Sequence, residues 1–383
     1  MKNATWLINC IFLMVGRTAL ADDAVPSAAD ATPTAPVLAS PLRIGGYLEG
    51  SYSWNFTQPR DGNTAQRGFD SQHNSLTMEN VALDAQWTAG RVTGQLTLQA
   101  GSTPTSYYGS DAAVARGIRN IQQAWAAYRF GTSQAVTISA GLFLSPIGPE
   151  SMAIKDNWTW SRSNLFWALP FYHVGARAAW AASPRWTVTG AVYNGWNQAA
   201  DGNRGKSVTV NAAYTAEDVS AMVQYFGGVE RPTDAPEGQP WRHLVDLYGT
   251  WAATSRLTLR SQLNAGFERG ALGTQRWFAA AMYAHVAATP QWAGTARADC
   301  IRETHSGSGS PSPSRIFLPT SQVCSVTATL GYQPAVGFAV RAEVRADAAA
   351  DAIFVGDDAP AAAPSTPTRT TQQTATLGVI GWF

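Results

Sequence analysis

The feature that most constrains the fold is a two-residue alternation of apolar and polar side chains, repeated in segments of about ten residues. It is clearest at the end of the chain, where Leu377, Val379 and Phe383 alternate with Thr376 and Gly378. A period of two indicates a β-strand with one apolar face and one more polar face. Because the pattern recurs throughout the chain, the expected fold class is all-β.

Short and long connections alternate between these segments. Short turns are predicted at 88–90, 131–134, 183–185, 215–218, 252–255, 287–290 and 333–337. Longer polar connections are predicted at 57–72, 101–117, 146–172, 197–206, 230–241, 268–275, 302–320 and 348–370. Short periplasmic turns and long extracellular loops are typical of transmembrane barrels. The prediction is a closed antiparallel transmembrane β-barrel of about sixteen strands, with fourteen or eighteen left open.

Two segments do not show which face points outward. In one, Phe278 and Met282 compete with Trp277 and Tyr283 for the apolar side. In the other, residues 73–80 break the alternation, which suggests a β-bulge.

The first residues have the pattern of a secretory signal peptide. Lys2 precedes an apolar run and Ala19-Leu20-Ala21 supplies a cleavage site, so residues 1–21 are predicted to be removed. Residues 22–41 are rich in Ala, Pro, Thr and Ser and are expected to form a disordered periplasmic linker. Composition and alternation stay the same over residues 42–383, which are therefore expected to form a single barrel domain. No later segment has about 18 consecutive apolar residues, so any membrane would be crossed by strands.

Composition favours a membrane barrel over a soluble β protein. Charged residues are 14% of the chain, against roughly 25% in soluble domains, and there are 15 Trp. A soluble β-sandwich or propeller would have no place to bury an apolar outer face on every strand. The net charge of +1 argues against nucleic acid as a partner.

If the apolar face points to lipid, the charged side chains of the other face line a lumen. The predicted lumen residues are Arg43, Glu49, Asp84, Arg91, Arg129, Arg177, Arg256, Arg260, Arg297, Arg341, Glu343 and Arg345, together with Asp246, Asp299 and Asp347. On the lipid side such charges would cost roughly 2–4 kcal/mol near the midplane. Two interpretations stay open. The arginines form a ladder that gives weak anion preference, or they pair with wall carboxylates and stiffen the barrel.

The connection 146–172 combines charged residues with many aromatic ones. Its charged residues are Glu150, Lys155, Asp156 and Arg162, beside Trp158, Trp160, Phe166 and Trp167. Because aromatic side chains favour burial, the segment is expected to fold into the lumen and constrict it, with its charges facing the wall arginines. The alternative is a loop packed on the rim or at a subunit contact.

Cys300 and Cys324 are the only cysteines after the predicted cleavage site, and they lie near one rim on consecutive strands. In an oxidising compartment, a disulfide that joins the two ends of the intervening loop is expected. The alternative is two free thiols.

The sequence contains little that would indicate a metal site or a catalytic site. The five histidines are scattered without ligand spacing, at His73, His173, His243, His285 and His305. Ser161 and Ser163 have no convincing histidine partner. No metal, no cofactor and no enzyme activity are therefore expected.

Residues 121–196 contain a series of short motifs that resemble one known family. The motifs are Gln123-Ala124-Trp125, Ala140-Gly141-Leu142-Phe143, Ile147-Gly148-Pro149-Glu150, Trp160-Ser161-Arg162-Ser163, Pro170-Phe171-Tyr172-His173, Gly175-Ala176-Arg177 and Tyr193-Asn194-Gly195-Trp196. They resemble the OmpL-like β-barrel porin family of Gram-negative bacteria. Leu142 stands where that family commonly has a lysine. The ending in Phe383 also resembles the C-terminal signal by which the barrel-assembly machinery recognises outer-membrane barrels.

The resemblance implies an outer-membrane porin, surrounded by lipid, that lets small hydrophilic solutes diffuse through a water-filled channel. It does not identify a solute, and a homotrimer is one arrangement it allows. The alternative from another class is a plugged surface barrel whose extracellular loops act in adhesion or binding.

Overall fold

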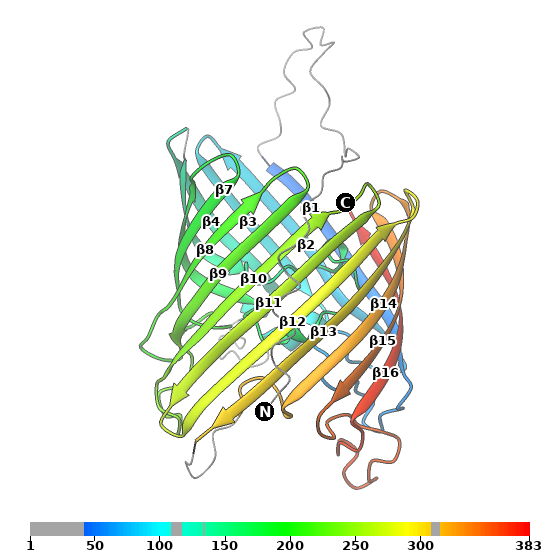
Figure 1. Cartoon of the computed structure of the whole chain (residues 1–383). Helices are drawn as coiled ribbons and strands as arrows, with labels where there is room; N and C mark the ends of the chain where they lie inside the picture. The colour runs from blue at the N-terminus through cyan, green and yellow to red at the C-terminus, as the bar shows by residue number, and fades with distance from the viewer. Residues whose placement is uncertain (1–41, 109–116, 133–134, 308–314) are drawn as a thin grey trace.

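The computed structural model describes residues 42–108, 117–132, 135–307 and 315–383, and within them the chain forms a closed barrel of sixteen antiparallel strands. Each strand pairs with its neighbours in sequence, and β1 pairs with β16 to close the ring (Figure 1). The predicted architecture and strand number are confirmed. The predicted signal peptide 1–21 and linker 22–41 lie outside the described residues.

The strands are long and regularly spaced. Their bounds are β1 (Leu42–Asn55), β2 (Ser75–Ala89), β3 (Val92–Ala100), β4 (Ile121–Phe130), β5 (Val136–Leu144), β6 (Tyr172–Ala181), β7 (Trp186–Tyr193), β8 (Ser207–Thr215), β9 (Val219–Val229), β10 (Trp241–Ala252), β11 (Leu257–Gly270), β12 (Gly273–Ala287), β13 (Trp292–Ser306), β14 (Gln322–Ala335), β15 (Phe338–Ala349) and β16 (Thr371–Trp382). Within the part of the chain that the structure describes, four short helical segments lie in the connections: α1 (Ser102–Tyr107), η2 (Ile118–Asn120), η3 (Ile154–Asp156) and α2 (Asn164–Trp167). Among the described residues, no helix is long and apolar enough to cross a membrane.

The two-residue alternation separates an apolar outside from a polar inside. On β1, Leu48 is 44% exposed, whereas its neighbours Tyr47 and Glu49 are buried. On β16, Leu377 is exposed and Thr376 is buried. The outer face is exposed and apolar along most strands, as a lipid environment requires, and ring closure leaves no unpaired strand edge.

The two rims of the barrel differ. Tight connections follow β2, β4, β6, β8, β10, β12 and β14, and we call this end the short-turn rim. The other end, the long-loop rim, carries the connections 56–74, 101–120, 145–171, 194–206, 230–240, 307–321 and 350–370. One predicted long connection is wrong: β11 and β12 are joined by Ala271 and Leu272 alone. The segment 268–275 is nevertheless polar, because side chains such as Glu268 and Gln275 are buried inside the barrel.

Both segments of uncertain facing are resolved. On β12, Trp277 and Tyr283 point inward and are buried, while Phe278 and Met282 are exposed. On β2 the register shifts beside Glu49, which pairs with Asn80 while Gly50 pairs with Met78. Glu79 is therefore the extra residue of a β-bulge, and both Glu79 and Asn80 are buried. The bulge suggested for residues 73–80 is confirmed.

Candidate functional site

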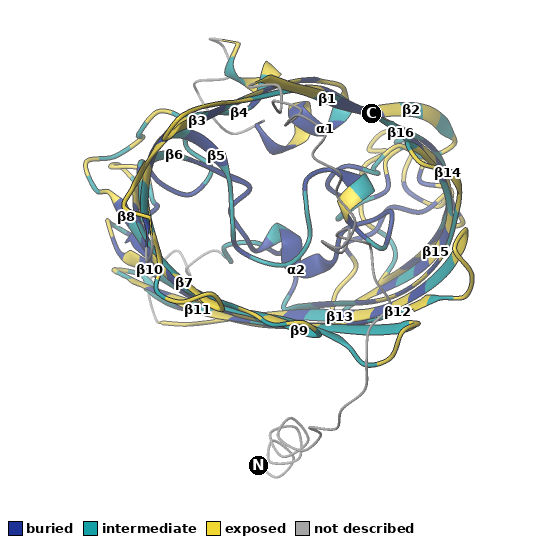
Figure 2. Cartoon of the chain, turned by 90° about the horizontal axis from the view of Figure 1, so that it is seen from above, coloured by how far each residue is buried: buried dark blue, intermediate teal, exposed yellow. Residues whose placement is uncertain are grey.

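The connection between β5 and β6, residues 145–171, lies inside the barrel, and we call it the inner loop. Figure 2 shows it within the ring of strands, together with α2. It leaves the wall at β5, contacts strands of the opposite wall and returns to the wall at β6.

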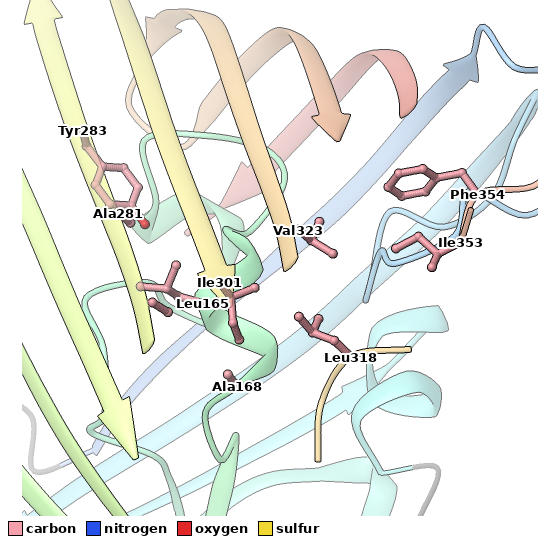
Figure 3. Packing of buried hydrophobic residues seen from close by; sticks show 10 residues of the cluster. Leu165, Ala168, Ala281, Tyr283, Ile301, Leu318, Val323, Ile353 and Phe354 are labelled. Atoms are coloured by element: carbon pink, nitrogen blue, oxygen red, sulfur yellow. The ribbon is translucent and has the colours of Figure 1, made fainter. Parts of the chain in front are cut away.

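Apolar contacts attach α2 to the wall. Leu165 and Ala168 belong to one buried cluster with Ala281 and Tyr283 of β12 and Ile301 of β13. Figure 3 shows Leu165 beside Ile301, with the two β12 side chains on the neighbouring strand. Because these wall residues face inward, they bury the apolar face of α2 rather than contacting lipid.

Wall carboxylates accept hydrogen bonds from the main chain of the inner loop. The Glu343 carboxylate on β15 accepts from the Trp160 N–H at 2.6 Å and from the Ser161 N–H at 3.0 Å. Glu49 on β1 accepts from the Ile154 N–H. Both glutamates are buried, so these N–H groups replace water around the charges.

Wall arginines donate to main-chain oxygens of the same loop. Arg341 Nη1 lies 2.8 Å from the Ile154 oxygen, and Arg345 Nη1 lies 2.6 Å from the Arg162 oxygen. Arg297 Nη2 donates to the Arg162 oxygen at 3.2 Å. Arg297 and Arg345 also form ion pairs with carboxylates of their own strands, Asp299 at 3.1 Å and Asp347 at 2.7 Å. Arg297 and Arg345 are paired with carboxylates and bound to the loop, as in the second of the two interpretations, whereas Arg341 is bound to the loop without an ion pair to a described residue.

Trp160 lies completely buried at the centre of these contacts. Its indole Nε1 donates to the bulge residue Glu79 at 3.0 Å. Its ring packs on Gly378 of β16, where a Cβ would lie 2.1 Å from Trp160 Cζ3. Glycine at this position leaves the space that the indole occupies.

The charges of the inner loop itself are distributed differently from the prediction. Only Glu150 pairs with a wall arginine, Arg297, at 3.2 Å. Lys155 pairs with its neighbour Asp156 at 2.8 Å. The Arg162 guanidinium donates to main-chain oxygens of its own loop, including that of Trp160 at 3.2 Å.

The wall formed by β3 to β9 carries a second group of arginines. Arg91, Arg129 and Arg177 line a cavity of about 400 Å³, and no Asp or Glu of the described residues lines it. Arg177 donates to Ser139 Oγ at 3.0 Å and lies over the Phe143 ring at 4.1 Å. None of these three arginines forms an ion pair with a described residue. Arg177 therefore presents uncompensated positive charge to the interior, and Arg91 and Arg129 present it at the exposed short-turn end of the cavity.

The remaining predicted lumen residues occupy the wall and the short-turn rim. Asp84 accepts from Gln95 Nε2 at 2.8 Å on the inner face of β2. Arg260 on β11 lies over the Trp158 ring of the inner loop at 3.9 Å. Arg43 and Arg256 are exposed at the short-turn rim, the second of them in the turn before β11.

Several charged residues with contacts inside the barrel were missed from the sequence, Glu79, Arg67 and Arg242 among them. Glu79 was missed because the β-bulge interrupts the alternation on β2. Arg67 lies in a long connection, yet it enters the barrel and pairs with Asp70 at 2.6 Å and Asp347 at 3.2 Å. Burial alone would lower the pKa of Arg67, but the two carboxylates outweigh burial and raise it. Arg242 on β10 shares the strand parity of Asp246, and that parity would have identified it.

Cys300 and Cys324 are direct partners in the ladder between β13 and β14, and the structure joins them by a disulfide. Their side chains share the outward parity of Ala298 and Val326. No group of three or more His, Cys, Asp or Glu side chains in the described ranges could hold a metal ion.

Known proteins similar to this chain include a porin family and outer-membrane channels. The protein family described as "Putative beta-barrel porin-2, OmpL-like" matches residues 41–383. No curated protein sequence matches the chain.

Solved structures with the same fold have very different sequences. The outer membrane channel DcaP of Acinetobacter baumannii is 11% identical, with 89% of this chain and 97% of that chain covered and a TM-score of 0.60. An anion-selective porin from Comamonas acidovorans is 10% identical, with 89% and 99% covered and a TM-score of 0.57. OmpT of Vibrio cholerae, in a trimer form, is 9% identical, with 89% and 99% covered and a TM-score of 0.56. Family and fold together indicate a channel rather than an enzyme.

Proposed function

Because the chain belongs to the OmpL-like family of β-barrel porins, we propose that it forms a water-filled channel through which small hydrophilic solutes cross the outer membrane. A barrel of sixteen strands is wide enough for an aqueous channel, whereas eight strands would be filled by side chains. The main support for the proposal is that the interior is divided between the inner loop and an open cavity. The inner loop contacts β1, β2, β11 to β13, β15 and β16, and the arginine-lined cavity lies along β3 to β9.

The inner loop sets the size limit of this channel. Its support comes from the wall glutamates and arginines that hold its main chain, because a loop fixed at many points narrows the lumen permanently. Glu150, Lys155, Asp156 and Arg162 are its charged groups, and Lys155 and Asp156 are those most exposed to a passing solute.

Deleting residues 155–165 tests the constriction. The deletion removes Trp160 and its contacts, so the single-channel conductance in a planar bilayer is expected to rise. Deleting residues 360–367, an exposed stretch of the long-loop rim, is the matched control and leaves the conductance unchanged. An unchanged conductance after the first deletion would remove the constriction from the proposal.

The channel has a weak preference for anions, set by Arg91, Arg129 and Arg177. Positive groups without acidic partners raise the local anion concentration in a narrow, low-dielectric passage. The anion selectivity of the Comamonas acidovorans porin, which has the same fold, agrees with this assignment. A reversal potential measured across a salt gradient tests it directly, because its sign reports which ion crosses faster.

A plugged barrel that binds partners through its outer loops is the second candidate. The burial of α2 and Trp160 against the wall favours it, since these contacts fill part of the lumen. Conductance separates the two candidates. Folded protein that never opens channels would support the binding function.

The protein reaches the membrane as a secreted chain and is assembled there. Cleavage after Ala21, a periplasmic linker over 22–41 and recognition of the strand ending in Phe383 by the barrel-assembly machinery complete the proposal. The trimer form of the Vibrio cholerae protein supports a homotrimer as the arrangement to test first.

A further inference from the structure

A second arginine-lined cavity lies on the long-loop side of α2, and we call it the vestibule. It has a volume of about 520 Å³. Its lining combines two arginines and three side-chain amides with large aromatic residues: Gln66, Arg67, Tyr107, Asn164, Trp167, Phe171, Trp196, Asn197, Arg242 and Phe317. No described Asp or Glu lines it. A volume of this order is typical of small-molecule pockets.

Arg242 is the vestibule arginine with unused donors. Its Nε donates to Glu268 at 2.9 Å, and that carboxylate is fully buried and also accepts from Arg231. Neither Nη1 nor Nη2 of Arg242 has a hydrogen-bond acceptor among the described residues. By contrast, both Nη groups of Arg67 are engaged, by Asp70 and by Asp347, and only its buried Nε has no partner among the described residues. The vestibule therefore offers one guanidinium edge to a ligand that brings its own acceptors.

Aromatic rings hold this guanidinium in place. The Arg242 guanidinium carbon lies 5.1 Å from the centre of the Trp196 ring and 5.8 Å from that of Phe317. The two rings are 5.7 Å apart. The main chain of Trp196 is fixed in turn, because its main-chain N–H donates to the buried Glu230 carboxylate at 2.7 Å. The guanidinium is thus oriented before any ligand arrives, which lowers the entropy lost on binding.

Another aromatic pair belongs to the end of the inner loop. Trp167 and Phe171 pack edge to face, with ring centres 5.5 Å apart. The Phe171 N–H donates to Asn197 Oδ1 at 2.6 Å, which joins the inner loop to the connection 194–206. The Asn197 Nδ2 and the Gln66 amide have no hydrogen-bond partner among the described residues. Free donors beside aromatic surfaces favour an acceptor-rich ligand with a flat apolar face.

From these contacts we propose that the vestibule binds small carboxylates that carry an aromatic ring. The carboxylate lies against Nη1 and Nη2 of Arg242, and the ring contacts the aromatic side chains. The inference rests on the proposed channel function, in which these solutes would next meet Arg91, Arg129 and Arg177. A neutral saccharide fits less well, because the acidic groups that usually accept from sugar hydroxyls do not line the cavity.

The test is calorimetric titration of the folded full-length barrel in detergent with benzoate. Acetate has the charge without the ring, benzyl alcohol has the ring without the charge, and glucose represents the saccharide. Benzoate is expected to bind at least about tenfold more tightly than each of the three, because only benzoate meets both kinds of contact. Equal affinities for benzoate and acetate, or tighter binding of glucose, would overturn the proposal.

Two variants locate the binding site. Arg242→Gln is expected to raise the benzoate Kd by about tenfold, because the charged hydrogen bonds are lost. The matched control, Arg256→Gln in the exposed turn before β11, leaves the Kd unchanged. If the first variant does not fold, Arg242→Lys keeps the positive charge beside Glu268. It still weakens benzoate binding, because the planar guanidinium and its two Nη donors are lost. A Kd unaffected by both Arg242 variants contradicts the assignment.

Conductance in potassium chloride alone tests the channel separately. Calorimetry needs only folded protein, so failure to form channels would not change the benzoate result. Open channels without benzoate binding would overturn the vestibule and leave the channel function standing.

Discussion

At the scale of single residues, charged side chains of the wall bind the main chain of the inner loop as well as some of its side chains. Glu343 accepts two loop N–H groups, and Arg341 and Arg345 donate to loop oxygens. Every residue has a main-chain oxygen and every residue except proline a main-chain N–H, so no pattern in the loop sequence reveals such contacts. The sequence therefore predicted where the wall charges lie, but could not predict what they bind.

The anchoring role of Glu343 can be measured. Glu343→Gln keeps the shape of the side chain but removes the charge that two N–H groups and Thr329 share. The free energy of unfolding in urea is expected to fall by about 1–3 kcal/mol, because charged hydrogen bonds are replaced by weaker ones. Glu217→Gln, in an exposed turn, is the control and changes little. Equal unfolding energies for the two variants would refute the anchoring role.

The arginines of the β3 to β9 wall should control ion preference. Arg129→Gln removes a charge that no described carboxylate compensates. The permeability ratio of chloride to potassium is expected to fall by roughly twofold, the size of one partly screened charge. The reversal potential in a salt gradient measures the ratio. Arg256→Gln, exposed in a turn at the short-turn rim, should leave it unchanged, and an equal shift for both variants would contradict the assignment.

At the scale of elements, strands were predictable and their ends were not. The alternation is local, so it located the tight turns after β2, β6 and β10. The alternation predicted a loop wrongly where side chains are polar for another reason. The polar residues 268–275 belong to a hairpin between β11 and β12, and Glu268 there is the buried partner of Arg231 and Arg242. Alternation cannot separate a polar loop from a strand end whose charges are paired inside the barrel.

The pairing of β13 with β14 provides a test of the predicted disulfide. Cys300 and Cys324 face each other in the ladder and are bonded in the structure. Mature protein denatured without reductant is expected to show no titratable thiol, and two after reduction. Two thiols before reduction would show that the bond does not form in the cell. Retention of Cys10 would add one thiol to either count, so the N-terminal residue must be determined in the same sample.

At the scale of the whole molecule, closure depends on the first and last strands of the barrel meeting at the short-turn rim. The Phe383 N–H donates to the Gly46 oxygen at 3.1 Å, and the Gly46 N–H donates to the Phe383 oxygen at 3.3 Å. Gly46 allows this close approach, since a Cβ there would lie 2.7 Å from the Ala82 oxygen. An even number of strands places both ends on one rim, which makes this seam possible.

The Phe383 ring itself contributes little to this seam, because it is 79% exposed. Phe383→Ala keeps both main-chain hydrogen bonds, so the unfolding energy of refolded protein should change by less than about 0.5 kcal/mol. If the barrel-assembly machinery recognises the terminal ring, the amount of folded barrel in the outer membrane should nevertheless fall several-fold. Phe383→Tyr keeps an aromatic terminus and should restore that amount. Equal amounts for all three proteins would mean that closure alone is sufficient, whereas a parallel loss of stability and amount would assign the ring a structural role.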